Sequence, residues 1–170
     1  MESVSRFSRT CSIAASLIGL VTTGMPALAV AQGIPKQANF EVTFYGVGAA
    51  TKIMPVEGDD AVTLHEDTLL FVNNASTPLF QNVVSKCFSV NYTKGLLNGY
   101  CVFTDKDGDK FVETISRTAG TKTGKGTLGS GTGKYKGIDG QLEWEPVAFL
   151  PADKGTYNFV GKKTGHYRLP

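Results

Sequence analysis

The chain has 170 residues with 17 basic and 15 acidic side chains, so its formal net charge at pH 7 is only +2. This balance gives no electrostatic reason to bind nucleic acid or an acidic surface, and a hydrophobic content of 41% excludes a disordered chain. The two histidines, His65 and His166, are far apart in the sequence, and the three cysteines form no cluster with them. We therefore expect neither a metal site nor a cofactor.

The N-terminal segment predicts a secretory signal peptide. Two arginines precede an apolar stretch of small residues at 11–25, and two A-x-A sites follow it. We expect cleavage after Ala31, with Ala29 as the alternative, and a secreted or periplasmic protein with one domain of 139 residues (170 − 31), at 32–170. The apolar stretch is too short for a membrane span, and nothing else is apolar for long enough. Cys11 leaves with the signal peptide, so two cysteines remain.

Short stretches of alternating apolar and polar residues follow, separated by clusters of Gly, Pro, Asn and Asp. This period of two is typical of half-buried β-strands, and no stretch has the pattern of an amphipathic helix. From 118 to 140, 8 of the 23 residues are glycine, so a strand there must be narrow or bulged. The expected strands are 40–45, 62–72, 80–92, 96–104, 110–117, 140–150 and 155–169.

Strands of this length and spacing predict an antiparallel sheet, folded either as a barrel or as a sandwich. A closed barrel of about eight strands leaves no exposed sheet edge. We therefore expect an all-β protein: a small, closed, antiparallel β-barrel of about eight strands that follows a cleaved signal peptide.

The two remaining cysteines lie in one predicted β-hairpin. A two-residue turn at Asn98-Gly99 has favourable turn chemistry but places Cys87 and Cys101 far apart. A three-residue loop at 93–95 instead places them directly opposite each other, with Cα atoms roughly 4.5–5.5 Å apart, as a disulfide requires. Since a secreted protein meets an oxidising compartment, we predict a Cys87–Cys101 disulfide over two separate thiols. Residues 98–99 then form a bulge or twist point inside the second strand.

Two motifs resemble known sites but lack required residues. Residues 105–110 begin like a calcium-binding EF-hand loop, but Lys110 replaces the required glycine and Ser116 the bidentate glutamate. Residues 129–134 begin like a phosphate-binding loop, but Tyr135 stands where Ser or Thr is needed. Both segments are better interpreted as turns. No G-x-S-x-G motif accompanies the histidines, so a serine triad has no local signature either.

Glu113 is the carboxylate of greatest interest. It shares a strand face with Phe111 and Ile115, and a buried carboxylate needs a partner. It either pairs with Arg117 or reaches solvent at the barrel mouth, or it is a polar anchor, or an acid with a raised pKa, inside an apolar cavity. Three aromatic residues are equally suited to line that cavity or to fill a plain core: Tyr45, Trp144 and Tyr157.

Two segments carry a resemblance to a known family. The runs G-Y-C-V-F-T-D-K-D-G-D-K at 99–110 and G-T-G-K-Y-K-G-I-D-G at 131–140 are followed by a closing strand pair. Over 99–169 the chain resembles small secreted bacterial proteins with an allene oxide cyclase-like, calycin-type β-barrel, most of unknown function. The plant cyclases of this fold isomerise an unsaturated fatty-acid epoxide, largely by holding its shape. None of their catalytic residues matches a position here, so the resemblance implies a barrel with an apolar ligand cavity.

Two functions are compatible with these observations. The first is a secreted, non-enzymatic barrel that binds a small apolar ligand or a protein partner, and the lack of a catalytic signature favours it. The second is a cofactor-free isomerase or cyclase acting on a hydrophobic substrate inside the barrel, with Glu113 as its candidate catalytic residue. The candidate ligand-binding residues are Tyr45, Glu113, Trp144 and Tyr157. Barrels related to this one often associate, so an oligomer is compatible with either function.

Overall fold

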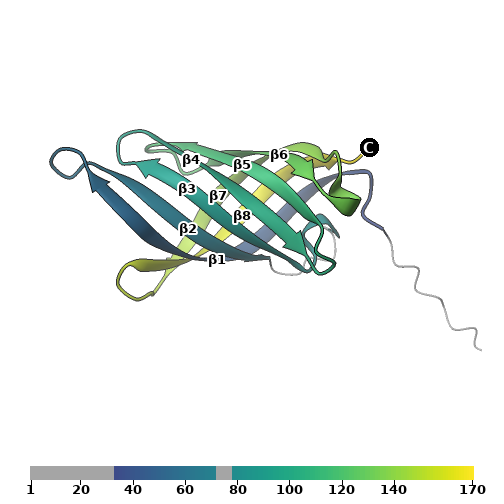
Figure 1. Cartoon of the computed structure of the whole chain (residues 1–170), viewed down its shortest axis with the longest axis horizontal. Helices are drawn as coiled ribbons and strands as arrows, with labels where there is room; N and C mark the ends of the chain where they lie inside the picture. Colours follow the sequence, from purple (N-terminus) through teal and green to yellow (C-terminus); the bar gives the residue numbers. More distant parts are fainter. Residues whose placement is uncertain (1–32, 72–77) are drawn as a thin grey trace, which may run out of the picture. The chain divides into compact units, whose positions relative to one another are not determined.

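A computed structural model describes residues 33–71 and 78–170 and shows an all-β domain, which confirms the expected fold class (Figure 1). Both predicted cleavage sites, and the rest of the predicted signal peptide, lie outside the described residues. None of the described helices is long and apolar enough to cross a membrane. The strands are β1 (Gln37–Pro55), β2 (Ala61–Phe71), β3 (Val83–Tyr92), β4 (Leu96–Asp105), β5 (Lys110–Thr118), β6 (Gly124–Gly131), β7 (Asp139–Leu150) and β8 (Thr156–Arg168).

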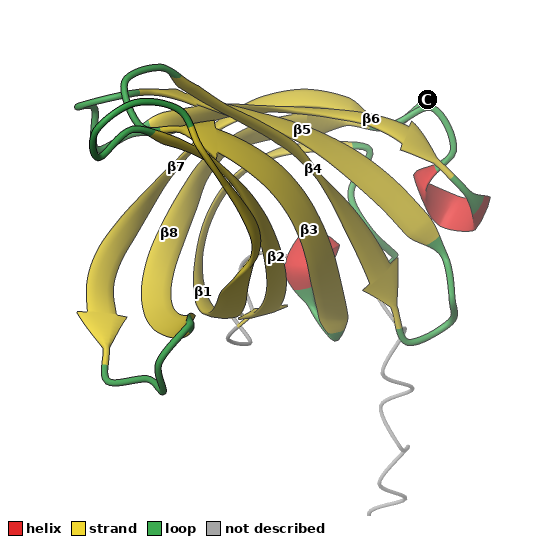
Figure 2. Cartoon of the chain, turned by 60° about the vertical axis from the view of Figure 1, so that its left-hand side comes forward, coloured by secondary structure: helices red, strands yellow, loops and turns green. Residues whose placement is uncertain are grey.

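Each strand pairs antiparallel with its neighbours in the chain, and β8 pairs with β1 to close the barrel (Figure 2). Two short 3₁₀ helices, η1 (Pro78–Phe80) and η2 (Gly133–Tyr135), lie in the connections. The glycine-rich segment provides β6, and two of its glycines face large side chains inside the barrel. A Cβ at Gly124 would collide with the Trp144 ring, and one at Gly126 with the carboxylate of Glu113. Because these glycines have no side chain, β6 leaves space inside the barrel for Trp144 and Glu113.

One end of the barrel is filled by aromatic rings. Phe80 of η1 lies 4.9 Å from Phe40, 5.7 Å from Phe103 and 6.1 Å from Phe111, measured between ring centroids, so η1 plugs this end from inside. Phe103 and Phe111, on neighbouring strands, stack at 4.5 Å. These rings come from the start of β1 and β5 and the end of β4, and all are buried. A cavity lies toward the other end of the barrel.

The hairpin has the predicted disulfide and the predicted register. Cys87 of β3 lies directly opposite Cys101 of β4, their Cα atoms are 4.0 Å apart, and the bond is formed. The loop at 93–95 makes the turn, where the Gly95 amide donates to the Tyr92 carbonyl at 2.9 Å. Asn98 and Gly99 continue β4 in regular pairing with β3. The bulge expected there does not form, because both residues keep their cross-strand partners.

The disulfide lies inside the barrel, which determines what β3 places outside. Cys87 and Ser89 face the interior and are buried, whereas Phe88 and Val90 face outward and are 53% and 45% exposed. In most half-buried strands the apolar residues are the inward ones. From Phe88 to Asn91 this alternation is reversed, so the interior gains polar groups there and the outer surface gains apolar ones.

Lys134 forms ion pairs with the carboxylates of the β4–β5 turn, whose sequence resembles the start of an EF-hand loop. Lys134 Nζ, from η2, lies 2.5 Å from Asp105 Oδ2 and 2.7 Å from Asp107 Oδ2. The other oxygen of the Asp105 carboxylate accepts hydrogen bonds from the backbone amides of Asp107 and Asp109, at 2.8 and 3.0 Å. An ammonium group thus holds these carboxylates together and ties η2 to the β4–β5 turn.

The disulfide closes a loop of 15 residues, because its cysteines are 14 positions apart. The double variant Cys87→Ser/Cys101→Ser should therefore lose about 3 kcal/mol of unfolding free energy, mainly because its unfolded state is less constrained. Urea unfolding followed by circular dichroism measures this loss, and reduced wild-type protein should show the same one. Equal unfolding midpoints for oxidised wild type and variant would contradict the prediction.

Candidate functional site

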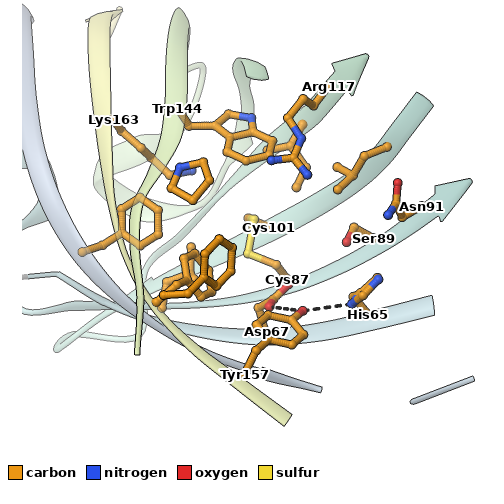
Figure 3. A pocket seen from close by; sticks show the side chains of 17 residues that line it. His65, Asp67, Cys87, Ser89, Asn91, Cys101, Arg117, Trp144, Tyr157 and Lys163 are labelled. Carbon is orange, nitrogen blue, oxygen red and sulfur yellow. Dashed lines mark hydrogen bonds between the residues drawn. A yellow bond between two sulfur atoms is a disulfide. The ribbon is translucent and has the colours of Figure 1, made fainter. Parts of the chain in front are cut away.

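A cavity of about 360 Å³ opens at the end of the barrel opposite the ring-filled core (Figure 3). The end of β3 and the start of β4 line it through Asn91 and Leu97, and the start of β8 through Tyr157. Its walls are mainly apolar, which suits a ligand that must leave water. The apolar lining side chains are Phe44, Leu69, Leu97, Ile115, Trp144, Pro146, Phe149 and Phe159, with the Cys87–Cys101 disulfide at one wall.

Three polar side chains from two strands form a hydrogen-bonded chain at one side of the cavity. Tyr157 Oη donates to Asp67 Oδ1 at 2.7 Å. The Tyr157 Oη atom also lies 3.1 Å from His65 Nδ1. Because the hydroxyl has one hydrogen and gives it to Asp67, its oxygen accepts from the Nδ1–H form of His65. Figure 3 shows the three groups together below the disulfide, with Arg117 and Trp144 on the opposite side.

Glycine on β1 makes this contact across strands geometrically feasible. Asp67 and Tyr157 belong to β2 and β8, which are separated by β1, and both pair with Gly48 of that strand. A Cβ at Gly48 would collide with the Asp67 carboxylate and with the Tyr157 ring. Gly46, two positions earlier, leaves room in the same way for Phe159. The stretch Gly46-Val47-Gly48 therefore shapes this side of the cavity.

Burial changes the protonation behaviour of this group. Desolvation raises the pKa of Asp67, although the hydrogen bond from Tyr157 and the nearby His65 act against it. Desolvation lowers the pKa of His65, opposed by the charge of Asp67. The pKa of Tyr157 is raised by burial and by its bond to Asp67. Each group is thus biased toward its neutral form, as is common in ligand and catalytic sites.

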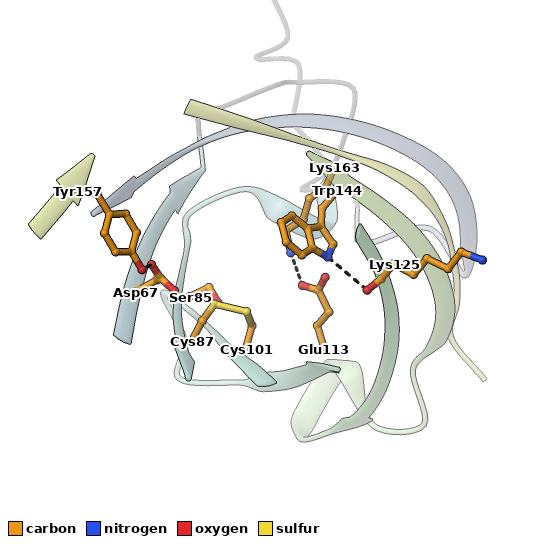
Figure 4. The surroundings of a disulfide bond; sticks show 9 residues. All are labelled: Asp67, Ser85, Cys87, Cys101, Glu113, Lys125, Trp144, Tyr157 and Lys163. Atoms are coloured by element: carbon orange, nitrogen blue, oxygen red, sulfur yellow. Dashed lines mark hydrogen bonds and ion pairs between the residues drawn. A yellow bond between two sulfur atoms is a disulfide. The ribbon is translucent and has the colours of Figure 1, made fainter. Parts of the chain in front are cut away.

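Glu113 lies inside the barrel, but its partner is Lys163 and not Arg117. Both side chains are almost completely buried, at 0% and 2% exposure, and they form an ion pair across the barrel between β5 and β8 (Figure 4). Lys163 Nζ also lies 5.7 Å from the centre of the Phe44 ring. The second carboxylate oxygen of Glu113, Oε1, has no hydrogen-bond partner among the described residues. Burial raises the pKa of Glu113, and the charge of Lys163 opposes the shift.

The structure therefore separates Glu113 from the cavity surface. Lys163 lines the cavity, whereas Glu113 lies behind it. Trp144 and Tyr157 both line the cavity, and the Trp144 indole N–H donates to the Lys125 carbonyl at 3.3 Å. Tyr45 faces outward and is 49% exposed. Because residues alternate along β1, its neighbour Phe44 is the side chain that faces the cavity.

Sequence reasoning did not propose five of the polar lining residues as site residues: His65, Asp67, Ser89, Asn91 and Lys163. A signal existed for the first two, which are two positions apart and share a face with Leu69. His166, the other histidine, is exposed on the outer face of β8. Arg117 lies at the mouth, where its guanidinium group is 5.2 Å from the centre of the Trp144 ring.

No protein-family model matches the chain, and no curated protein matches it in sequence. Solved structures with a similar fold include two pterocarpan synthase dirigent proteins. The first is 15% identical, has a TM-score of 0.50, and is matched over 81% of this chain and 94% of its own. The second is 14% identical with a TM-score of 0.49, over 81% and 98%.

At this identity the first similarity concerns the fold alone, and it agrees with the closed β-barrel found here. The protein is therefore an eight-stranded β-barrel with a cavity at one end. The finer resemblance to allene oxide cyclase-like proteins remains a prediction.

The Glu113–Lys163 pair predicts a strongly non-additive pattern of stability. Glu113→Leu or Lys163→Met alone leaves one buried charge without a partner and should cost about 3–5 kcal/mol of unfolding free energy. The double variant removes both charges and should recover most of that loss. Urea unfolding of the four proteins forms the double-mutant cycle. Additive losses would show that the two charges do not depend on each other.

The raised pKa of Asp67 predicts a pH dependence of stability. The folded protein holds the Asp67 proton at pH values where the unfolded chain, with a pKa of about 3.9, has released it. Stability from this residue is therefore greatest below that value and falls as the pH rises through the folded pKa. Asp67→Asn should flatten this fall in unfolding free energies measured from pH 3 to 8.

The lowered pKa of His65 acts in the opposite direction, so the difference between wild type and variant is the quantity to compare. Glu57→Gln, which removes an exposed carboxylate between β1 and β2, controls for net charge. A wild-type profile unchanged by Asp67→Asn would contradict the assignment.

Proposed function

We propose that this protein binds a small, largely apolar molecule in the cavity at the open end of its barrel. The observation that carries the proposal is a cavity of about 360 Å³, open at one end of the barrel, with aromatic and aliphatic walls and only a few polar groups. Ligand sites in proteins are commonly of this kind, with volumes of roughly 300–1,000 Å³. The opposite end of the same barrel is filled with side chains, so the cavity is a local feature and not loose packing throughout.

The polar groups suit a ligand with one hydrogen-bonding substituent. Asp67 and Tyr157 lie on one side of the cavity, while Trp144 and Arg117 lie on the other (Figure 3). A flat apolar body can lie between the aromatic side chains, with its polar substituent at Asp67. Aromatic walls bury a large apolar area and orient flat molecules. Because the few polar groups are fixed by bonds to one another, they can select an orientation of the ligand.

The proposed setting is secreted or periplasmic. The disulfide indicates an oxidising environment, and the predicted signal peptide, with cleavage after Ala31 or Ala29, would lead there. A pterocarpan synthase dirigent protein with the same fold, and the resemblance to allene oxide cyclase-like barrels, are in accord with a small-molecule role. The comparison itself concerns the fold and names no ligand for this chain.

A cofactor-free isomerase or cyclase is the second candidate function, and one observation favours it. Asp67 is a carboxylate with a raised pKa at the surface of an apolar cavity, hydrogen-bonded to Tyr157. A group of this kind can exchange a proton with a bound substrate. Asp67 is better placed for this than Glu113, which is paired with Lys163 behind the cavity surface.

The proposal predicts saturable binding of the neutral aromatic probe N-phenyl-1-naphthylamine, with quenching of Trp144, the single tryptophan of the chain and part of the cavity wall. Asn91→Phe places a ring in the cavity mouth and should weaken binding at least tenfold. Asn98→Phe adds the same ring on the exposed outer face of β4 and should leave binding unchanged. Fluorescence titration measures both effects.

Equal binding by the two variants would place the probe elsewhere and contradict the proposal. Mass spectrometry and chromatography of an added unsaturated epoxide distinguish the two functions. Recovery of an unchanged molecule supports binding. A product of the same mass but different retention, lost in Asp67→Asn, supports isomerisation.

A further inference from the structure

The outer surface of β1–β4 carries large apolar side chains that the barrel itself does not use. Six of them are 45% to 62% exposed, and together they define the apolar face: Tyr45, Val47, Leu70, Phe88, Val90 and Tyr100. Tyr45 is paired with Leu70, and Phe88 with Tyr100. The row of Thr68, Lys86 and Val102 lies between these two groups, and Val102 is itself 39% exposed. β1 to β4 are consecutive neighbours in the barrel (Figure 1), so both groups lie on the same outer surface, with Lys86 and Val102 between them.

This face cannot be explained by the barrel core. In the second half of β3 the inward positions are the disulfide and the polar Ser89 and Asn91, while apolar Phe88 and Val90 point outward. A barrel that works alone in water gains nothing from that arrangement. Monomeric soluble proteins rarely expose one apolar patch of more than a few hundred Å². A persistent apolar face of this kind marks a surface that is covered in the working state of a protein.

The exposed apolar area is large enough to form the hydrophobic centre of an interface, though not the whole of one. An aromatic side chain buries about 150–250 Å² when fully covered, and three on this face are about half exposed, at 49%, 53% and 62%. The rings alone therefore offer roughly 300 Å², before the aliphatic side chains between them are added. A standard interface buries about 800 Å² per partner, with a hydrophobic centre and a polar rim.

Two charged side chains within the face indicate what covers it. Lys86 and Glu66 are both exposed, on the adjacent strands β3 and β2, with Glu66 paired to Phe88 and Lys86 to Thr68. No ion pair joins either of them to another residue in the part of the chain that the structure describes. One acid and one base in a single apolar patch are self-complementary: in a two-fold contact, Lys86 of each copy meets Glu66 of the other.

We propose that the apolar face of β1–β4 is an interface between copies of this chain, centred on Phe88 and Tyr100 and aligned by reciprocal Lys86–Glu66 contacts. The interface and the cavity use the same strands but opposite faces. Glu66 alternates with His65 and Asp67, and Phe88 with Cys87 and Ser89. Contact between copies therefore supports the cavity wall from outside without filling the cavity.

Sedimentation equilibrium of the purified protein over a range of concentrations tests the proposal. Wild type should associate, and Phe88→Thr/Tyr100→Thr should raise the dissociation constant at least tenfold, because Thr keeps the preference for a strand but removes the ring. Ile53→Thr is the matched control: Ile53 is 60% exposed but lies outside the apolar face, toward the far end of β1. It should leave association unchanged. Probe binding in each variant shows that the barrel is still folded.

Charge reversal gives the sharper result. Lys86→Glu and Glu66→Lys should each weaken association at least tenfold, since each places like charges together. An equimolar mixture of the two variants should restore it, because opposite charges then meet at both contacts. A wild type that stays monomeric, or a mixture no tighter than either variant alone, would overturn the proposal. Cosedimentation of monomers with phosphatidylcholine vesicles, lost in Phe88→Thr/Tyr100→Thr, would overturn it in favour of a lipid surface.

Discussion

The position of one disulfide inside the barrel determines the character of both surfaces of the sheet. Cys87 and Cys101 are directly opposed and face inward, so every alternate residue of β3 and β4 follows them in or out. A one-residue shift in either strand would exchange the two faces. This register gives the cavity its disulfide wall and its polar Ser89, and it sends Phe88 and Tyr100 to the outside. Cavity and outer face are thus two results of a single constraint.

The interior shows how a small barrel can contain charged groups and open space. The Glu113–Lys163 pair spans the barrel between the ring-filled end and the cavity, so neither charge stands alone in an apolar medium. Gly126 leaves room for the Glu113 carboxylate, and Gly48 for the contact of Asp67 with Tyr157. Each of these two polar pairs therefore lies against a glycine of a neighbouring strand. The glycine-rich composition noted in the sequence has a specific function in packing.

Sequence patterns predicted the barrel and the disulfide register because both follow from local rules: alternation, turn length and the two cysteines that remain after the predicted signal peptide. The site was harder, for physical reasons. Tyr45 was selected for its aromatic ring, although it is in phase with the polar Glu41 and Thr43, which places it on the outer face. Lys162 and Lys163 are adjacent and chemically identical, and only the closed barrel brings the second beside Glu113. Asp67 and Tyr157 are 90 positions apart and meet across a third strand.

Substitutions at Gly46 and Gly48 of β1 would change the shape of the cavity. The backbone there lies directly beneath the Phe159 and Tyr157 rings, and no side chain intervenes. A single methyl group added at either position must displace the ring above it. One such change would tilt an aromatic wall, and the other would loosen the Asp67 contact, while every polar side chain keeps its identity. The shape of the cavity can therefore be changed at the backbone of β1 without changing any polar lining residue.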